Sequence, residues 1–222
     1  MISVIIPAYE EAASVARVVK FAKSLSFVGE VIVVDDGSAD DTAQRAAEAG
    51  ALVVVHKRNL GKTRAVQTGA EHAKHDDVLM LDADMQGLSE QDFKKAYRVY
   101  RDADMVVLDY GGQHWVVRHS LLPATSGARL LKRRVLLEAP FTNANHWEVE
   151  GVINRYLFSR GAVVRVVVAT DLFSPRKESK YGRLRGMWLN LRSLVLISLS
   201  LGWFKLPLTW LDWWRFQRLR RE

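Results

Sequence analysis

The chain has no cysteine, no long apolar run and no basic leader, and each absence excludes a class of protein. Without cysteine it cannot form disulfides or thiolate metal sites, which fits a reducing compartment. Residues 194–204 are uncharged and mostly apolar, but a membrane-spanning helix needs about twenty such residues. The N-terminal residues lead directly into an apolar, β-branched segment, so we expect no signal peptide. With 49% hydrophobic residues in a chain of 222, we expect one well-packed core.

The net charge of +7 is concentrated in the C-terminal tail. Residues 172–222 contain eleven Lys and Arg against three Asp and Glu, whereas the rest of the chain is close to neutral. The tail also contains five of the seven tryptophans, namely Trp188, Trp203, Trp210, Trp213 and Trp214. Such composition is typical of short amphipathic helices at an anionic membrane surface, and it does not favour nucleic-acid binding. The alternative is a tail that packs on its own domain or on a second subunit.

Short β-branched segments alternate with segments of helical periodicity. We predict strands at residues 3–6, 31–34, 52–55, 78–81, 105–108 and 162–168. Helices are predicted at residues 15–25, 66–73, 93–100 and 147–159, and a strand followed by a helix at 125–137. Fully apolar strands between helices predict an α/β fold with a mostly parallel sheet and helices on both faces. Ligands of such sheets bind at the carboxyl ends of the strands.

The acidic segment Asp82-Ala83-Asp84-Met85-Gln86 follows directly after one of these apolar strands. Side chains alternate along a strand, so Asp82 and Asp84 point the same way. Their carboxylates would repel each other unless a cation lies between them. A hard cation such as Mg²⁺ or Mn²⁺ prefers one or two carboxylates together with phosphate oxygens of a substrate. The segment therefore predicts a metal site, although solvated loop acids are the simpler interpretation of two acids alone.

Three further motifs follow other predicted strands, and together the four resemble a known family. They are Pro7-Ala8-Tyr9-Glu10-Glu11, the run from Val33 to Thr42 that contains Asp35-Asp36-Gly37-Ser38, and Asn59-Leu60-Gly61-Lys62. In this order they resemble the family 2 inverting glycosyltransferases, which have the Rossmann-like GT-A fold. The resemblance is dense over residues 2–92. Two later segments, at 125–129 and 176–180, are similar to the polyprenyl-phosphate branch that includes dolichol-phosphate mannose synthase.

The resemblance implies which residues bind the nucleoside of a UDP- or GDP-sugar donor. Pro7, Tyr9 and Glu10 would flank the nucleoside, although a tight loop with Glu10 as a helix cap is an equal alternative. Asp35 or Asp36, with Asp36 favoured, would accept hydrogen bonds from the base or the ribose. The alternative for this acidic pair is a turn around Gly37-Ser38.

The diphosphate end of the donor is assigned to four residues. By resemblance, Asp82 lies near the ribose and the metal, Asp84 binds the metal that bridges the diphosphate, and Gln86 adds a neutral oxygen ligand. The helix start at Lys62 could bring backbone N–H groups and an ammonium near the phosphates, or Lys62 could be a solvated helix residue.

The acceptor decides which other side chains the reaction needs. A lipid phosphate is already anionic, so it requires cations that hold it and no strong base. The candidate cations are Arg118, Arg129, Arg176 and Lys180. A hydroxyl acceptor would instead require a carboxylate base, for which Glu148 and Glu150 are the candidates. Between Leu108 and Thr125 the chain is shorter than the resemblance implies, and Arg118 lies in this segment.

We therefore expect a metal-dependent inverting glycosyltransferase, peripheral on the cytoplasmic face of a membrane. It would move a hexose from a nucleotide sugar to polyprenyl phosphate. Residues 1–185 would form the catalytic domain and residues 186–222 the membrane-associating helices. Transfer to the hydroxyl of a glycolipid or glycan is one alternative. A membrane-tethered protein that binds nucleotide sugars without turnover is another.

Overall fold

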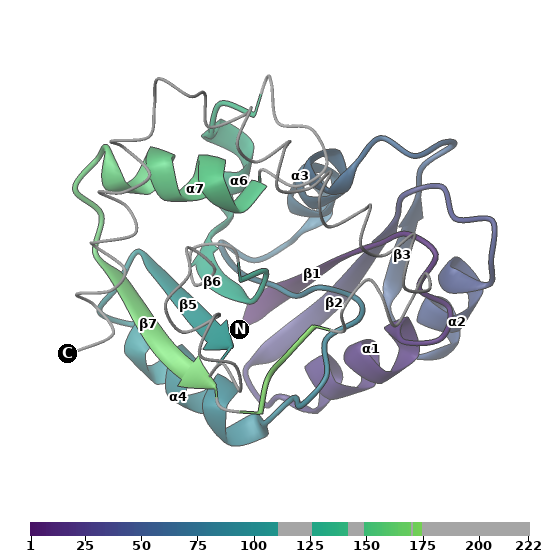
Figure 1. Ribbon diagram of the computed structural model, residues 1–222, viewed down its shortest axis with the longest axis horizontal. Helices are drawn as coiled ribbons and strands as arrows, with labels where there is room; N and C mark the ends of the chain where they lie inside the picture. The colour runs from purple at the N-terminus through teal and green to yellow at the C-terminus, as the bar shows by residue number, and fades with distance from the viewer. Residues whose placement is uncertain (111–125, 142–148, 170, 175–222) are drawn as a thin grey trace, which may run out of the picture.

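Alternating strands and helices build a seven-stranded sheet that is covered on both faces (Figure 1). The computed structural model describes residues 1–110, 126–141, 149–169 and 171–174. The elements are β1 (Ile2–Ala8), α1 (Val15–Ser24), β2 (Val28–Asp35), α2 (Thr42–Glu48), β3 (Leu52–Val55), α3 (Lys62–His72), β4 (Asp77–Met80), α4 (Glu90–Tyr100), β5 (Met105–Tyr110), β6 (Arg129–Lys132), α6 (Arg133–Glu138), α7 (Val149–Phe158) and β7 (Val164–Ala169).

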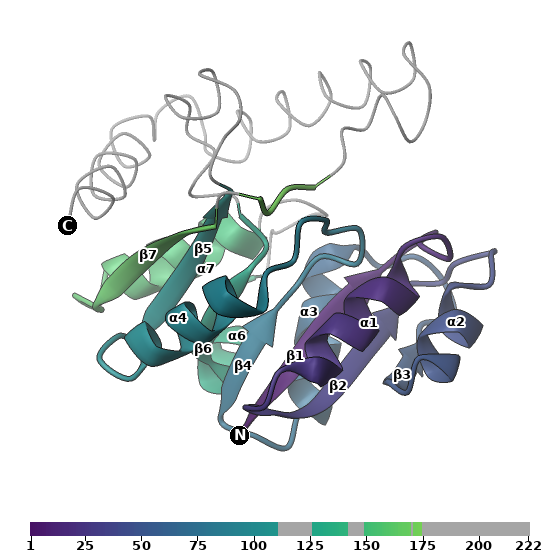
Figure 2. The same cartoon turned by 90° about the horizontal axis from the view of Figure 1, so that it is seen from below.

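The strands lie in the order β3-β2-β1-β4-β6-β5-β7, with β3 and β7 at opposite edges of the sheet (Figure 2). All neighbours are parallel except β6, which runs antiparallel to both β4 and β5. The register pairs Ala8 with Asp35, Ile5 with Met80, and Met80 with Arg129. The carboxyl-terminal ends of β1, β2 and β4 and the start of β6 therefore lie next to one another. They form the carboxyl-terminal edge of the sheet, which runs across the strand ends and is distinct from the outer strands β3 and β7.

Side-chain alternation divides the interior into two layers, one on each face of the sheet. On one face, Val4 and Ile6 of β1 pack with α1, α2 and α4. On the other face, Ile5 packs with α3, α6 and α7. The helices supply the matching apolar stripes. In α1 the buried residues Val15, Val18, Val19 and Ala22 have the spacing of one helix face.

The sequence-based prediction of a mostly parallel α/β sheet is confirmed. Each predicted strand is present, the segment 125–137 contains β6 followed by α6, and Ser89 caps α4 through the backbone N–H of Asp92. No range was predicted for helix α2, which was expected only as a helix that Asp40 or Asp41 would begin; it follows Asp41. None of the described helices is both long and apolar enough to cross a bilayer. The predicted tail helices at 186–222 lie outside the described residues, so the division into two domains stays a prediction.

Two helical glycines provide a test of how closely α3 packs on the sheet. A Cβ on Gly69 of α3 would lie 2.4 Å from Cγ2 of Ile5, whereas no described atom lies within 4 Å of a Cβ on Gly151 of α7. We expect Gly69→Ala to lower the free energy of unfolding by about 1–3 kcal/mol, because β1 or α3 must shift. Gly151→Ala should raise it by up to about 1 kcal/mol, through helix propensity. Urea denaturation measures both, and equal effects would contradict close packing at Gly69.

Candidate active site

A partly buried ion-pair cluster lies at the edge where the parallel strands end. Nζ of Lys62 is 2.6 Å from Oδ1 of Asp82 and 2.6 Å from Oε1 of Glu150. The three side chains are 18%, 22% and 5% exposed, respectively. Lys62 begins α3 after Gly61 (φ 92°), Asp82 follows β4, and Glu150 lies in the first turn of α7. The cluster therefore joins three elements that are far apart in the sequence.

The protonation state of Lys62 follows from these contacts. Burial on its own lowers the pKa of Lys62, but the attraction and hydrogen bonds of Asp82 and Glu150 outweigh it and raise this pKa above the usual value of a lysine. Lys62 therefore carries its charge at neutral pH. Its ammonium binds two carboxylates of the protein in this structure, whereas the sequence placed it near the phosphates of a donor.

Asp82 is enclosed on its other side by the backbone of Gly127. A Cβ on Gly127 would lie 2.2 Å from Oδ2 of Asp82, so a larger residue would collide with the carboxylate. This contact brings residues 126–129, which include the candidate acceptor cation Arg129, against the acid assigned to the donor. Gly127 lies within the segment 125–129 that resembles the polyprenyl-phosphate branch, but no signal in the sequence indicated its close approach to Asp82.

Asp84 and Gln86 are covered by the short segment that follows β7. Oγ of Ser174 donates to Oδ1 of Asp84 at 2.8 Å, and Gln86 forms two backbone hydrogen bonds with Phe173. Gly87 (φ 66°) allows this approach, because a Cβ there would lie 1.6 Å from the carbonyl oxygen of Asp171. The predicted metal ligands are thus held against residues 171–174. Ser174 is a contact that the sequence analysis missed.

The oxygen atoms that these side chains offer as metal ligands fit a hard divalent cation. Asp82 and Asp84 lie after the same strand and are partly exposed, and oxygen is the only donor type that they and Gln86 offer. Among the described residues, no group of three or more acidic or histidine side chains could hold an ion by itself. An ion bound here would therefore need further ligands, such as phosphate oxygens of a substrate.

Asp36 is buried and organises the loop that leads to Lys62. Its Oδ1 accepts from the backbone N–H of Leu60 at 2.9 Å and lies 2.7 Å from Nδ1 of His56. Its Oδ2 accepts from the N–H of Gly61 at 2.7 Å. Nε2 of His56 continues the network to Thr68 at 3.0 Å. Three contacts occupy most of the acceptor capacity of this carboxylate, so its predicted role in binding the nucleoside stays a prediction.

The loop after β1 lies against the loop after β2. Glu10 has a left-handed backbone (φ 57°); its N–H donates to Oγ of Ser38, and its Oε1 accepts from the N–H of Ala39. Asp35 is also engaged locally, because Ser38 donates to it twice. Tyr9 is 45% exposed at this edge, next to Pro7 near the end of β1. The predicted place of Tyr9 beside the nucleoside stays a prediction.

Arg129 is fully buried at the start of β6. Its Nε donates to the carbonyl oxygen of Ser126 at 2.6 Å, and its Nη1 donates to Oδ1 of Asn154 on α7 at 2.5 Å. These bonds join the sheet to α7 and favour a structural part for the guanidinium. The predicted grip on an acceptor phosphate stays a prediction, and it would require this side chain to become accessible.

Several predicted residues lie outside the described part of the chain. These are Arg118, Glu148, Arg176 and Lys180. Of the predicted acceptor residues, Arg129 and Glu150 are therefore the two that the structure places. Arg17 was not predicted, but its Nη2 donates to the carbonyl oxygen of Met85 at 3.1 Å and so supports the acidic segment from α1.

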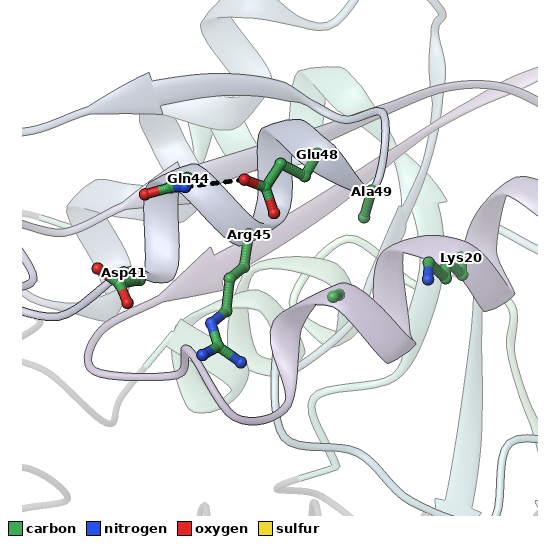
Figure 3. Close-up of a pocket in the computed structure, with 7 residues that line it drawn as sticks. Lys20, Asp41, Gln44, Arg45, Glu48 and Ala49 are labelled. Carbon is green, nitrogen blue, oxygen red and sulfur yellow. Dashed lines mark hydrogen bonds between the residues drawn. The ribbon is translucent and has the colours of Figure 1, made fainter.

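A surface hollow of about 350 Å³ lies between α1 and α2 (Figure 3). Lys20, Asp41, Arg45 and Glu48 line it with charges of both signs, and Gln44 donates to Glu48 within α2. None of the predicted site residues lines this hollow. We therefore place the candidate site at the ion-pair cluster.

The sequence matches the model of one protein family and is similar to several named enzymes. The sequence model of glycosyl transferase family 2 matches residues 3–141. The undecaprenyl-phosphate 4-deoxy-4-formamido-L-arabinose transferase of Pseudomonas savastanoi pv. phaseolicola is 38% identical over 100 residues, which are 40% of this chain and 30% of that protein. The same enzyme of Aeromonas hydrophila subsp. hydrophila is 39% identical over 101 residues, or 41% and 31% of the two chains. The match thus spans about a third of these relatives.

Solved structures share the fold. Glucosyl-3-phosphoglycerate synthase from Mycobacterium tuberculosis, in complex with Mn²⁺ and UDP-glucose, superimposes with a TM-score of 0.66 and 26% identity over 79% of this chain and 71% of that one. Its complex with phosphoglyceric acid gives 0.65 and 24% identity over 82% and 77%. The sheet is therefore the GT-A fold that the sequence predicted.

Burial of Arg129 leads to a stability prediction. Arg129→Ala should lower the free energy of unfolding by about 2–5 kcal/mol, because it leaves a cavity and removes the partners of Ser126 and Asn154. The exposed Arg98 on α4 is the matched control, and Arg98→Ala should change stability by no more than about 0.5 kcal/mol. Urea denaturation of both variants decides. Wild-type stability of Arg129→Ala would contradict a structural role.

Proposed function

The chain belongs to glycosyl transferase family 2, and we propose that it is a metal-dependent inverting transferase that moves a sugar from a nucleotide-diphosphate donor to polyprenyl phosphate. One observation carries the donor half of this proposal. Asp82 and Asp84 follow β4 at the edge of the sheet where β1 and β2 also end. Ligands of open α/β sheets bind at this position.

The comparisons support the choice of donor and metal. The mycobacterial synthase of the same fold binds UDP-glucose together with Mn²⁺. In the present chain Asp84, with Asp82 and Gln86, would hold Mg²⁺ or Mn²⁺. When bound, such an ion neutralises the charge that develops on the departing diphosphate. Tyr9 and Glu10 would lie beside the nucleoside, and Lys62 would contribute positive charge from the start of α3.

The acceptor is proposed from the curated relatives and from the chemistry of inversion. The relatives are named for transfer to undecaprenyl phosphate. An oxygen of a lipid phosphate would attack the anomeric carbon from the face opposite the diphosphate. A new bond forms between this oxygen and the anomeric carbon as the bond from that carbon to the diphosphate breaks. The electron pair of the broken bond leaves with the nucleoside diphosphate. Because the attacking oxygen is already anionic, no side chain has to remove a proton. The relatives' sugar is an arabinose derivative, so we propose a sugar without restricting it to hexoses.

The phosphate of the lipid acceptor would be a second anion in the site, beside the diphosphate of the donor, and cations must hold it. Arg176 and Lys180 are proposed for this role, together with Arg118, because guanidinium and ammonium groups bind phosphate strongly. Arg129 remains in this group of proposed ligands. Its guanidinium is buried, so it would have to become accessible before it could bind a phosphate. Transfer to a hydroxyl, with Glu150 as the base, is less well supported because Glu150 already accepts a bond from Lys62.

The basic tail is proposed to hold the enzyme at the cytoplasmic, anionic surface of the membrane. The support comes from the sequence, in which tryptophans and an excess of basic residues coincide after residue 172. Such an anchor would bring the site close to the phosphate head of a lipid acceptor.

The role of Asp84 can be tested by substitution. Asp84→Ala should reduce metal-dependent transfer by at least about 100-fold, because the diphosphate loses its counter-charge as it leaves. The exposed Asp102 is the matched control, and Asp102→Ala should retain wild-type turnover. Transfer of radiolabelled sugar to undecaprenyl phosphate, measured with Mn²⁺ and a panel of nucleotide sugars, gives the readout. Absence of turnover with every donor in the wild type would favour a binding protein without catalysis.

Membrane association can be tested in the full-length chain. Replacement of Arg215, Arg218, Arg220 and Arg221 by Gln should weaken binding to phosphatidylserine-containing vesicles by about 1 kcal/mol for each charge at the surface. The control replaces four exposed basic residues of the catalytic body, Lys57, Arg58, Lys95 and Arg101. Vesicle co-sedimentation measures both. If the control variant loses binding and the tail variant retains it, the anchor lies in the catalytic body.

A further inference from the structure

Glu150 lies at the centre of the candidate site but is almost inaccessible. It is 4% exposed on α7, and its Oε1 accepts a hydrogen bond from the ammonium of Lys62. The same ammonium lies at the same distance from Oδ1 of Asp82. One cation is therefore shared by two carboxylates, of which one is assigned to the donor and the other is covered by protein.

The charge balance of this cluster suggests what Glu150 does. Lys62, Asp82 and Glu150 together carry a net charge of −1. Without Glu150, the ammonium of Lys62 would neutralise Asp82, and the net charge of the pair would be zero. Glu150 therefore leaves one negative charge in this cluster next to the proposed cation site.

We propose that Glu150 is a positioning residue that shares the ammonium of Lys62 with Asp82, and so maintains the negative charge that attracts the donor's divalent cation. Glu150 acts through Lys62 and touches neither the donor nor the acceptor. This inference rests on the proposed function, because it concerns the affinity of the same metal site. It differs from the predicted role of Glu150 as a base, since a base affects turnover and leaves cation binding unchanged.

The geometry favours positioning over proton transfer. A base must reach the acceptor hydroxyl within hydrogen-bond distance. The carboxylate of Glu150 instead meets Lys62, which is fixed by the start of α3, and the loop before α3 is tied to Asp36 through Leu60 and Gly61. The backbone of Lys62 is therefore fixed within α3, and its ammonium is held by Glu150 of α7. Removing a partner of a buried ion pair leaves the other partner uncompensated, so charges in this cluster respond to each other strongly.

Cation affinity is the decisive measurement. The experiment titrates the 222-residue chain with Mn²⁺ in the presence of UDP, and separately of GDP, and follows free Mn²⁺ by electron paramagnetic resonance. Glu150→Gln should raise the Kd for Mn²⁺ about three- to tenfold, because one negative charge near the ion is lost. Glu138→Gln, on the exposed side of α6, removes the same charge away from Lys62 and should leave the Kd unchanged. Glu150→Asp, which keeps the charge, should lie between wild type and Glu150→Gln.

The conservative variant separates charge from structure. Glu150→Asp keeps the negative charge, whereas Glu150→Gln removes it and keeps the side-chain length. Thermal denaturation of each variant establishes that the titrations are made on folded protein. If the α7 contact served stability alone, Glu150→Asp would lose Mn²⁺ affinity as much as Glu150→Gln does.

Three results would overturn the inference. Unchanged Mn²⁺ affinity in Glu150→Gln with turnover reduced by about 100-fold or more would identify a base. Unchanged affinity with unchanged turnover would leave Glu150 without influence on the site. Equal loss of Mn²⁺ affinity in Glu150→Asp and Glu150→Gln would reduce the contact to a structural tether. If the wild type itself binds no Mn²⁺ with UDP or GDP, the proposed function fails first, and this outcome is distinguishable from the other three.

Discussion

The ammonium of Lys62 is the point at which three distant parts of the chain meet. It begins α3, it lies 2.6 Å from the acid that follows β4, and it lies 2.6 Å from a buried acid on α7. An ammonium between two carboxylates is stable in a partly buried place only if all three groups stay together, because each one alone would lose its hydration without compensation. The position of Asp82 at the edge of the sheet therefore depends on helices that pack on the same face.

The antiparallel strand β6 makes this meeting possible. It runs between β4 and β5, so the segment before it, with Gly127, returns to the edge where β1 and β4 end. Gly127 then lies against Asp82, and Arg129 fixes α7 through Asn154. A purely parallel arrangement would place the start of this strand at the opposite edge. The one reversed strand therefore brings the two halves of the chain to a common site.

Sequence reasoning identified the framework because its signals are local. Apolar runs and helical spacing predicted the strands β1–β5 and the helices α1, α3 and α4, and the acids after β4 marked the edge that carries the candidate site. The sharing of Lys62 could not be predicted, because Glu150 is 88 residues away and no local pattern links the two. The same holds for Arg129 and Asp36, whose motifs suggest ligand contacts. Their side chains are buried and hydrogen-bonded to the protein, and burial depends on tertiary packing.

Charge explains why the proposed site would need acidic side chains for the metal and separate basic side chains for the acceptor. In the proposed function, the charge of the divalent ion is taken up by the acids after β4 and by the donor's diphosphate, so the protein would have to supply separate cations for a phosphate acceptor. In the sequence, the basic residues at 176–180 come soon after Ser174, which donates to Asp84, and Phe173, which forms two backbone hydrogen bonds with Gln86. If residues 176–180 bind the acceptor as proposed, these bonds tie the start of the acceptor's ligands to the acids of the donor site, so that the position of one set of ligands constrains the other.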